Sequence, residues 1–134
     1  MQTFLPYADF SKCAKVLDNK RIGNQVYHEG LTLIRGGWKN HPASKMWRGH
    51  EHALAKYCLA LLDELKTRGR DYPKWFKYYQ NCLKKFKDTG LPKCVGDERV
   101  HSSHRAALLA KNYEHYSQFG WLEKPTINYV WVFE

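Results

Sequence analysis

The sequence predicts a single all-α domain, and three observations lead to this prediction. Apolar residues recur at spacings of three and four along most of the 134 residues, which is the period of a helix buried on one side. Capping residues, glycines and prolines divide this pattern into segments of helical length. A chain of this size also buries a core without disulfides. We expect about five helices in one compact domain over residues 1–134.

The first half of the chain consists of an arm and three predicted helices. The short apolar stretch before Tyr7 contains Pro6 and is expected to be an extended arm. Asp9 can cap the first helix, and Gly36 follows the end of the second. The third is the longest and carries His50 on its apolar stripe. These helices are predicted for residues 10–17, 18–35 and 43–68.

The second half is predicted to contain two more helices and an aromatic tail. A helix covers residues 73–86, and residues 88–96 form a loop with two glycines and a proline. Asp97 caps a helix that continues to about Lys111. The tail, residues 124–134, is aromatic and β-branched, so it forms either a short strand or an extended segment across the helices.

The composition restricts the class of partner. The formal net charge of +9 favours a polyanion. Aromatic residues make up 15% of the chain, with five Trp and nine Tyr, which is more than a core of this size can bury. Some rings are therefore expected to face a ligand.

The cysteines and the apolar segments indicate the compartment. Four cysteines are widely spaced without a Cys-x-x-Cys pair, as expected of reduced core residues in an intracellular protein. No segment resembles a signal peptide, and no window approaches the roughly 20 apolar residues of a membrane span. A soluble cytoplasmic protein without membrane association is expected.

The predicted helix over residues 18–35 carries a chemically distinctive face. Arg21 and Gln25 recur at helical spacing with either His28 or Glu29, followed by Thr32. A solvated helix face also carries polar residues. However, a carboxylate among basic and aromatic groups is unusual, which makes Glu29 a candidate catalytic residue.

Three further clusters are candidate binding sites, each with a structural alternative. The segment 40–48 begins a helix, where amides and nearby cations can bind phosphate, although ordinary capping explains it as well. The segment 97–105 is a second helix start, or a satisfied histidine pair. The aromatic tail is either core or a platform for bases. The side chains concerned are His41, Lys45, Arg48, His101, His104, Arg105, Tyr129 and Trp131.

A metal site and a cofactor are not expected. The segment His50-Glu51-His52 lacks the i, i+4 histidine spacing of the helical zinc motif, and His101 with His104 supplies only two ligands. The sequence also contains no Gly-rich phosphate loop, nucleophile elbow or Cys-His signature.

The order of these motifs resembles the pyrimidine dimer DNA glycosylase family, typified by the phage endonuclease V enzymes. The resemblance covers nearly the whole chain and is strongest toward a bacterial and phage branch. The similar segments are Met1–Tyr7, Leu17–Gln25, Asn40–Ala43 with Met46–Gly49, Gly96–Glu98 with His101 and Ser103–Arg105, and Lys124–Thr126 with Tyr129.

The resemblance implies a compact helical repair enzyme that excises a damaged base and then nicks the abasic strand. In the family, the α-amino group at the chain start attacks the deoxyribose carbon, an imine forms, and a glutamate assists. Here Gln2 is bulky, so Met1 is expected to be retained and to supply the amine, with Lys20 as the alternative nucleophile. The family pattern places the glutamate near His28, and Glu29 is the nearest carboxylate.

The predicted function is therefore a DNA glycosylase with AP lyase activity that acts as a monomer in a bacterial or phage-infected cell. Its partner is double-stranded DNA with a damaged or modified base, such as a pyrimidine dimer. Two alternatives remain: a non-catalytic DNA-binding module and a metal-dependent nuclease. The predicted DNA contacts are Lys20, Arg21, Gln25, His41, Lys45, Arg48, His101, His104, Arg105, Tyr129 and Trp131.

Overall fold

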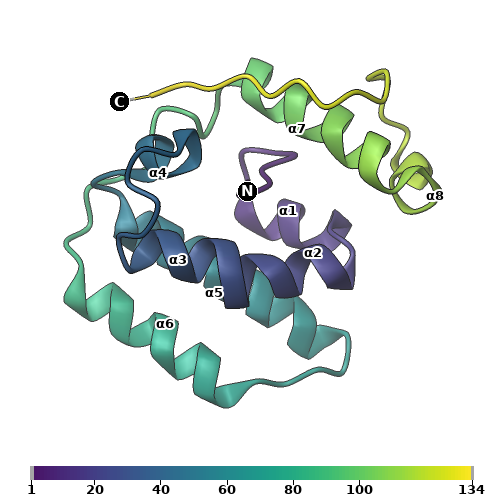
Figure 1. The fold of residues 1–134 in the computed structure, drawn as a ribbon. Helices are drawn as coiled ribbons and strands as arrows, with labels where there is room; N and C mark the ends of the chain where they lie inside the picture. The colour runs from purple at the N-terminus through teal and green to yellow at the C-terminus, as the bar shows by residue number, and fades with distance from the viewer. Residues whose placement is uncertain (1, 134) are drawn as a thin grey trace.

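The computed structural model describes residues 2–133, and within this range the chain forms helices, turns and extended segments without a β-strand. The prediction of an all-α fold is confirmed. Figure 1 shows the arrangement of the helices. They are α1 (Phe10–Val16), α2 (Asn19–Asn24), α3 (Gly30–Ile34), α4 (Pro42–Trp47), α5 (Glu51–Thr67), α6 (Pro73–Lys85), α7 (Glu98–Lys111) and α8 (Tyr113–Tyr116), with a π-turn at Gln25–Glu29 and a 3-10 turn at Ser117–Phe119.

Helix α5 is the central element of the core. Its apolar side chains at helical spacing, including Leu54, Leu61 and Leu65, are almost completely buried. Helices α1, α3 and α6 pack against it. In Figure 1, α6 lies on one side of α5, whereas α7 lies across the molecule on the other side.

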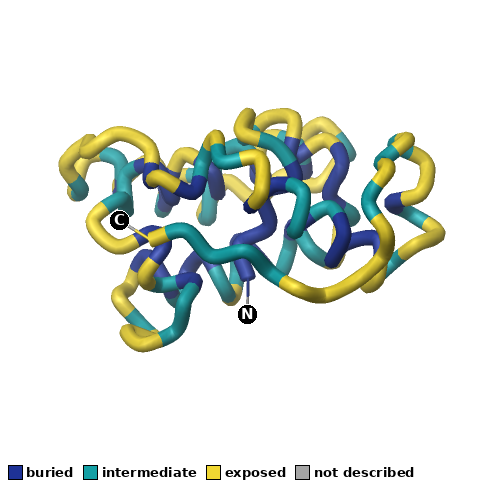
Figure 2. The backbone as a smooth tube through the Cα atoms, turned by 90° about the horizontal axis from the view of Figure 1, so that it is seen from above, coloured by how far each residue is buried: buried dark blue, intermediate teal, exposed yellow. Residues whose placement is uncertain are grey.

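The N-terminal arm, residues 2–6, is a buried segment without helical structure. A bend begins at Pro6, and Leu5 before it has no exposed surface. Figure 1 places the arm between α7 and the layer formed by α1 to α3, and Figure 2 shows its buried backbone in the interior. The predicted arm is thus present, and it forms part of the core.

The prediction of one continuous helix over residues 43–68 is wrong. Helix α4 ends at Trp47, and α5 begins at Glu51. Between them Gly49 has a φ of 81°, a left-handed conformation that glycine adopts readily, and the amide of His50 donates to the carbonyl of Trp47 at 2.8 Å. His50 therefore precedes α5 and is partly exposed, instead of lying on its apolar stripe.

The predicted helix over residues 18–35 is present, but it is not α-helical throughout. Helices α2 and α3 are joined without a break by the π-turn Gln25–Glu29. A π-turn is a one-residue insertion into an α-helix and occurs frequently at functional sites. The helix ends at Ile34, and Gly36 follows with a φ of 78°.

Helix α7 and the tail cover the arm from the other side. The Asp97 carboxylate caps α7 by accepting from the amide of Arg99 at 3.0 Å. Beyond α8 the tail is extended and runs along α7 in the opposite direction (Figure 1). The amide of Thr126 donates to the carbonyl of Ala106 at 3.2 Å. Of the two predicted forms of the tail, the extended segment is the one that occurs.

Two further observations bear on the composition. All four cysteines are buried, as expected for core residues. Of the helices found between residues 2 and 133, none combines the length and apolar character needed to cross a membrane.

Candidate active site

The buried arm is fixed at its beginning by Gln25 of the π-turn. The Gln25 side-chain amide donates to the carbonyl of Gln2 at 2.9 Å, and its oxygen accepts from the amide of Phe4 at 3.2 Å. The Tyr57 hydroxyl of α5 donates to the carbonyl of Phe4 at 2.5 Å. Gln25 is only 1% exposed. Its amide therefore satisfies the backbone of the arm, and does not lie on the protein surface as a DNA contact would.

Two buried histidines of α7 fix the middle of the arm. Nδ1 of His104 accepts from the amide of Leu5 at 2.8 Å, and Nδ1 of His101 donates to the carbonyl of the same residue at 2.8 Å. His101 also accepts from the amide of Gly96 at 2.9 Å through Nε2. Burial lowers the pKa of His104 to about 3, which keeps the ring neutral. Both residues were predicted as DNA contacts, and in the structure both are buried and bind the backbone of the arm.

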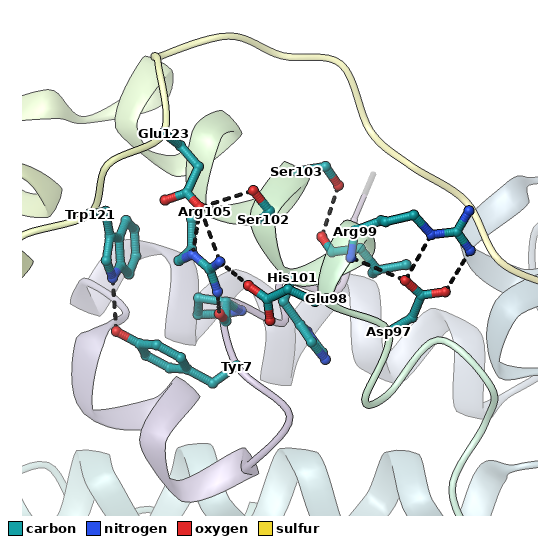
Figure 3. A network of polar contacts seen from close by, with 12 residues as sticks. Tyr7, Asp97, Glu98, Arg99, His101, Ser102, Ser103, Arg105, Trp121 and Glu123 are labelled. Carbon is teal, nitrogen blue, oxygen red and sulfur yellow. Dashed lines mark hydrogen bonds and ion pairs between the residues drawn. The ribbon is translucent and has the colours of Figure 1, made fainter.

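Arg105 fixes the end of the arm and links it to the tail (Figure 3). Its guanidinium donates to the carbonyl of Pro6 at 2.7 Å and pairs with Glu123 at 3.0 Å. Glu98 is a second carboxylate partner. The Arg105 guanidinium is thus bound by two carboxylates and by the arm, and its predicted contact with DNA stays a prediction.

Glu29 lies at the end of the same π-turn, one turn beyond Gln25. The amide of Gly30 donates to the carbonyl of Gln25, the i to i+5 bond that defines the π-turn. His28 is exposed, whereas Glu29 is half-buried. The π-turn therefore ends on the half-buried carboxylate that was selected as the candidate catalytic residue.

The environment of the Glu29 carboxyl is unusual for a structural residue. Its Oε2 atom is buried and has no hydrogen-bond partner among the described residues. Burial raises the pKa of Glu29, and nearby positive charges, including those of His28 and Lys111, act in the opposite direction. A half-buried carboxyl with a raised pKa and an unoccupied oxygen is suited to proton transfer.

The π-turn is stabilised by a close approach to α5. A Cβ atom at Gly30 would lie 2.5 Å from the carbonyl oxygen of Gln25 and 2.8 Å from Sγ of Cys58. Neither distance is possible for a real Cβ, so only glycine fits here. Gly30 therefore permits both the π-turn and the packing of the Glu29 segment on α5.

A row of aromatic rings extends from the arm to the protein surface. Phe4 contacts Tyr129 of the tail at a centroid distance of 6.3 Å, and Tyr129 contacts Trp131 at 5.6 Å. Trp131 in turn contacts His41 at 6.2 Å. These predicted residues are thus brought together, and the tail rings lie partly exposed along the arm.

The predicted cations lie at different depths in the structure. Arg21 is partly buried and pairs with Asp18 at 3.3 Å, and its charge lowers the pKa of Tyr129, which burial raises more strongly. Lys20, Lys45 and Arg48 are exposed. These side chains have the accessibility that contact with DNA phosphates requires.

His41 serves as the cap of α4. Its Nδ1 atom accepts from the amide of Ala43 at 3.0 Å, and burial lowers its pKa. The structural alternative of ordinary capping therefore applies to His41, in addition to its place in the aromatic row.

The chain start itself lies outside the described residues. The predicted nucleophile Met1 therefore has no structural description here. Gln2, the first described residue, is 2% exposed and is bound to Gln25. As for metals, residues 2–133 contain no cluster of three or more His, Cys, Asp or Glu side chains that could hold an ion.

The sequence patterns did not identify Tyr57, Trp47 or Gly30 as site residues. Nε1 of Trp47 donates to Oγ1 of Thr3 at 2.6 Å, and Tyr57 binds the carbonyl of Phe4. In the sequence both rings fall on an apolar stripe, which describes a core residue equally well. Only the path of the arm reveals their polar contacts.

The fold and the site define a compact helical protein in which a half-buried carboxylate lies beside a fixed N-terminal arm, within a basic and aromatic surface. Comparison with known families agrees with this class. The model of the pyrimidine dimer DNA glycosylase family matches residues 1–86, and the chain belongs to this family. It is accordingly a DNA glycosylase of the DNA repair type, with DNA as its substrate. Neither a curated protein nor a solved structure matches the chain significantly.

Proposed function

We propose that this protein excises a damaged or modified pyrimidine, such as a pyrimidine dimer, from double-stranded DNA and then nicks the abasic strand as an AP lyase. The observation that carries the proposal is the half-buried Glu29 carboxyl, whose Oε2 atom has no hydrogen-bond partner among residues 2–133 and which lies one helical turn from the Gln25 amide that binds the start of the arm. This arrangement supports Glu29 as the acid–base group that acts beside the arm.

The α-amino group of Met1 is the proposed nucleophile. Its reference pKa of about 8 is more than two units below that of a lysine, so a useful neutral fraction exists near pH 7 without burial. The nitrogen attacks C1′ of the deoxyribose, and the bond from C1′ to the base breaks. Loss of a proton from nitrogen and opening of the sugar ring then give an imine. Removal of a C2′ proton breaks the bond from C3′ to its phosphate oxygen.

Glu29 is the proposed acid–base partner in these steps. As a carboxylate it stabilises the positive charge that develops on the sugar when the base leaves. It then accepts a proton during imine formation and elimination, and it can return that proton to a leaving group. The absence of a hydrogen-bond partner for Oε2 among residues 2–133 supports this role, because a structural carboxylate is normally paired when buried.

The matched segment and the rest of the chain are proposed to act as one domain and as a monomer. His101, His104 and Arg105 lie beyond the matched residues 1–86, yet all three bind the arm. Because the arm is held from both sides, the C-terminal part contributes to placing the proposed nucleophile.

The test is incubation of the purified protein with a duplex carrying one abasic site, in the presence of borohydride and a chelator, followed by mass mapping of the crosslinked peptide. A covalent adduct on Met1 is expected, because borohydride reduces the imine to a stable amine. Blocking the α-amino group by acetylation should abolish the adduct, while the fold is retained.

Other outcomes lead to different functions. An adduct on Lys20 would move the nucleophile to that side chain. Binding without an adduct would remove the lyase step, and a base-release assay on dimer-containing DNA would then separate a simple glycosylase from a non-catalytic binding module. Strand cleavage that is abolished by the chelator would indicate a metal-dependent nuclease instead.

A further inference from the structure

Trp38 combines high exposure with a strained backbone. Its side chain is 56% exposed, and its φ of 54° lies in the left-handed region that bulky residues avoid. Within residues 2–133 it is the single non-glycine residue with a positive φ. Strain of this kind persists only where the surroundings impose it, and it concentrates at ligand-binding sites.

The surroundings of Trp38 do impose this conformation. The carbonyl of Gly37 accepts from the Ser44 hydroxyl at 3.1 Å, and the carbonyl of Trp38 accepts from the amide of His41 at 2.9 Å. The carbonyl of Lys39 accepts from the Arg48 guanidinium. Three consecutive carbonyls are thus tied to α4 and its ends, so the loop backbone is fixed on both sides of Trp38 while its side chain remains largely exposed.

The indole also continues the aromatic row of the candidate active site. The Trp38 ring lies 5.8 Å from the ring of His41, and His41 lies 6.2 Å from Trp131. The row then continues through Tyr129 to Phe4 of the arm. Trp38 is therefore the exposed outer end of a series of rings that begins beside the proposed catalytic centre.

The charges around Trp38 identify the chemistry of its partner. Lys39 follows it directly, and Lys45 and Arg48 lie on and just after α4; all three are exposed. An exposed aromatic ring among cations is the combination that binds unstacked nucleic-acid bases, since the ring stacks on a base while the cations contact its phosphates.

We propose that Trp38 stacks on an unstacked nucleobase near the excised base and that Lys39 and Lys45 contact the phosphates of the same strand. This inference rests on the proposed function, because it adds a base-stacking subsite to the DNA substrate of that reaction. The subsite does not include the proposed catalytic residues, Met1 and Glu29, and it contributes to substrate affinity.

The test compares the affinity of variants for a duplex with one reduced abasic site, which lacks the aldehyde needed for an imine and is therefore not nicked. Affinity is measured by fluorescence anisotropy of a labelled strand. Trp38→Gly should bind about 10-fold or more weakly, the loss expected when one base–aromatic stack is removed. The same substitution relieves the strained φ and should raise the melting temperature, which separates lost affinity from lost folding. Trp38→Phe keeps a stacking ring and should retain most of the affinity.

Tyr113 provides a matched control, because it is a 62% exposed aromatic residue on α8 that is not part of the row. Tyr113→Ala should bind as the unmodified protein does. Unchanged affinity of Trp38→Gly, or equal losses in Trp38→Phe and Trp38→Gly, would overturn the stacking role while leaving the proposed function intact. Absence of DNA binding and of borohydride trapping by the unmodified protein would overturn both.

Discussion

At the scale of single residues, the carboxyl of Glu29 combines a raised pKa with a buried oxygen that has no hydrogen-bond partner among residues 2–133. Glu29→Gln keeps the shape of the side chain and removes proton transfer, so base release and strand nicking should fall by about 10²- to 10⁴-fold. The fold should be retained, because Oε2 has no described partner to lose. Single-turnover assays on a lesion-containing duplex measure this effect, with Glu114→Gln on α8 as the exposed control.

The raised pKa of Glu29 also predicts the sign of a pH effect on stability. Because burial favours the protonated carboxyl in the folded state, its contribution to stability is complete at low pH and is lost as pH rises through the folded pKa. The melting temperature of the unmodified protein, relative to Glu29→Gln, should therefore fall between pH 4 and pH 7. If the melting temperature of the unmodified protein, relative to that of Glu29→Gln, rose with pH over this range, the raised pKa of Glu29 would be contradicted.

The residue scale is also where prediction from sequence was least complete. Glu29 and Arg21 could be selected because helical spacing places them on one helix. Gln25, His101 and His104 were selected as surface contacts, yet each binds the backbone of the arm. His104 and Leu5 are 99 positions apart, so no local pattern could reveal that these side chains meet.

At the scale of elements, the π-turn determines the direction in which Glu29 points. Gly30→Ala would place a Cβ against the carbonyl of Gln25 and Sγ of Cys58. Overpacking of this kind typically costs about 1–3 kcal/mol, and relief requires the π-turn to shift. We expect a lower free energy of unfolding in urea together with a loss of base release that exceeds the loss of folded protein.

Gly23→Ala is the matched control for this experiment. It lies on α2 in the same continuous helix, but its added Cβ would only meet the Tyr27 ring at 3.9 Å, an ordinary contact. Alanine is the better helix former by roughly 0.5–1 kcal/mol, so this variant should be at least as stable as the unmodified protein and fully active. Similar losses in both variants would show that the π-turn has no special role.

The helices illustrate what the sequence could and could not predict at this scale. Caps such as Asp9 and Asp97 and stops such as Gly36 gave the correct ends of several helices. The break at Gly49 was missed, because the apolar period continues through it and one glycine inside a helical pattern is tolerated. The π-turn was missed because its hydrogen bonds join backbone atoms and require no particular side chains. Its one residue requirement is the glycine that permits close packing.

Helix α7 binds the arm through His104, and the contribution of this residue to stability depends on pH. Burial lowers the pKa of His104 from 6.5 to about 3, so below pH 6.5 the unfolded chain binds a proton that the folded chain does not. The contribution of His104 to the free energy of unfolding is therefore fully present above pH 6.5. It decreases as pH falls, with a slope that approaches about 1.4 kcal/mol per pH unit. Urea unfolding between pH 7 and pH 5 measures this decrease.

His104→Gln identifies the source of this pH dependence. The glutamine oxygen can accept from the amide of Leu5 without titrating, so the decrease in unfolding free energy between pH 7 and pH 5 should become smaller. His28→Gln changes an exposed histidine and should leave the decrease as it is. An unchanged slope in His104→Gln would assign the effect to other groups.

At the scale of the whole molecule, the positive charge is distributed over two different faces. The exposed Lys45 and Arg48 lie near the aromatic row, whereas Lys77 and Lys84 lie on α6, which packs on α5 on the side away from α7 (Figure 1). A net charge of +9 alone does not distinguish these faces. Because the arm and the aromatic row lie on the first face, we propose that this face binds DNA and that α6 presents an ordinary solvated helix face.

Salt dependence of DNA binding tests this assignment. The logarithm of the binding constant falls linearly with the logarithm of salt concentration, with a slope of about −0.9 per neutralised phosphate. Lys45→Ala should therefore reduce the magnitude of the slope by about one and weaken binding equally for damaged and undamaged duplexes. Lys84→Ala removes the same charge from α6 and should leave the slope unchanged. If Lys84→Ala reduced the slope and Lys45→Ala did not, the DNA-binding face would have to be moved to α6, and the aromatic row would lose its place in the substrate complex.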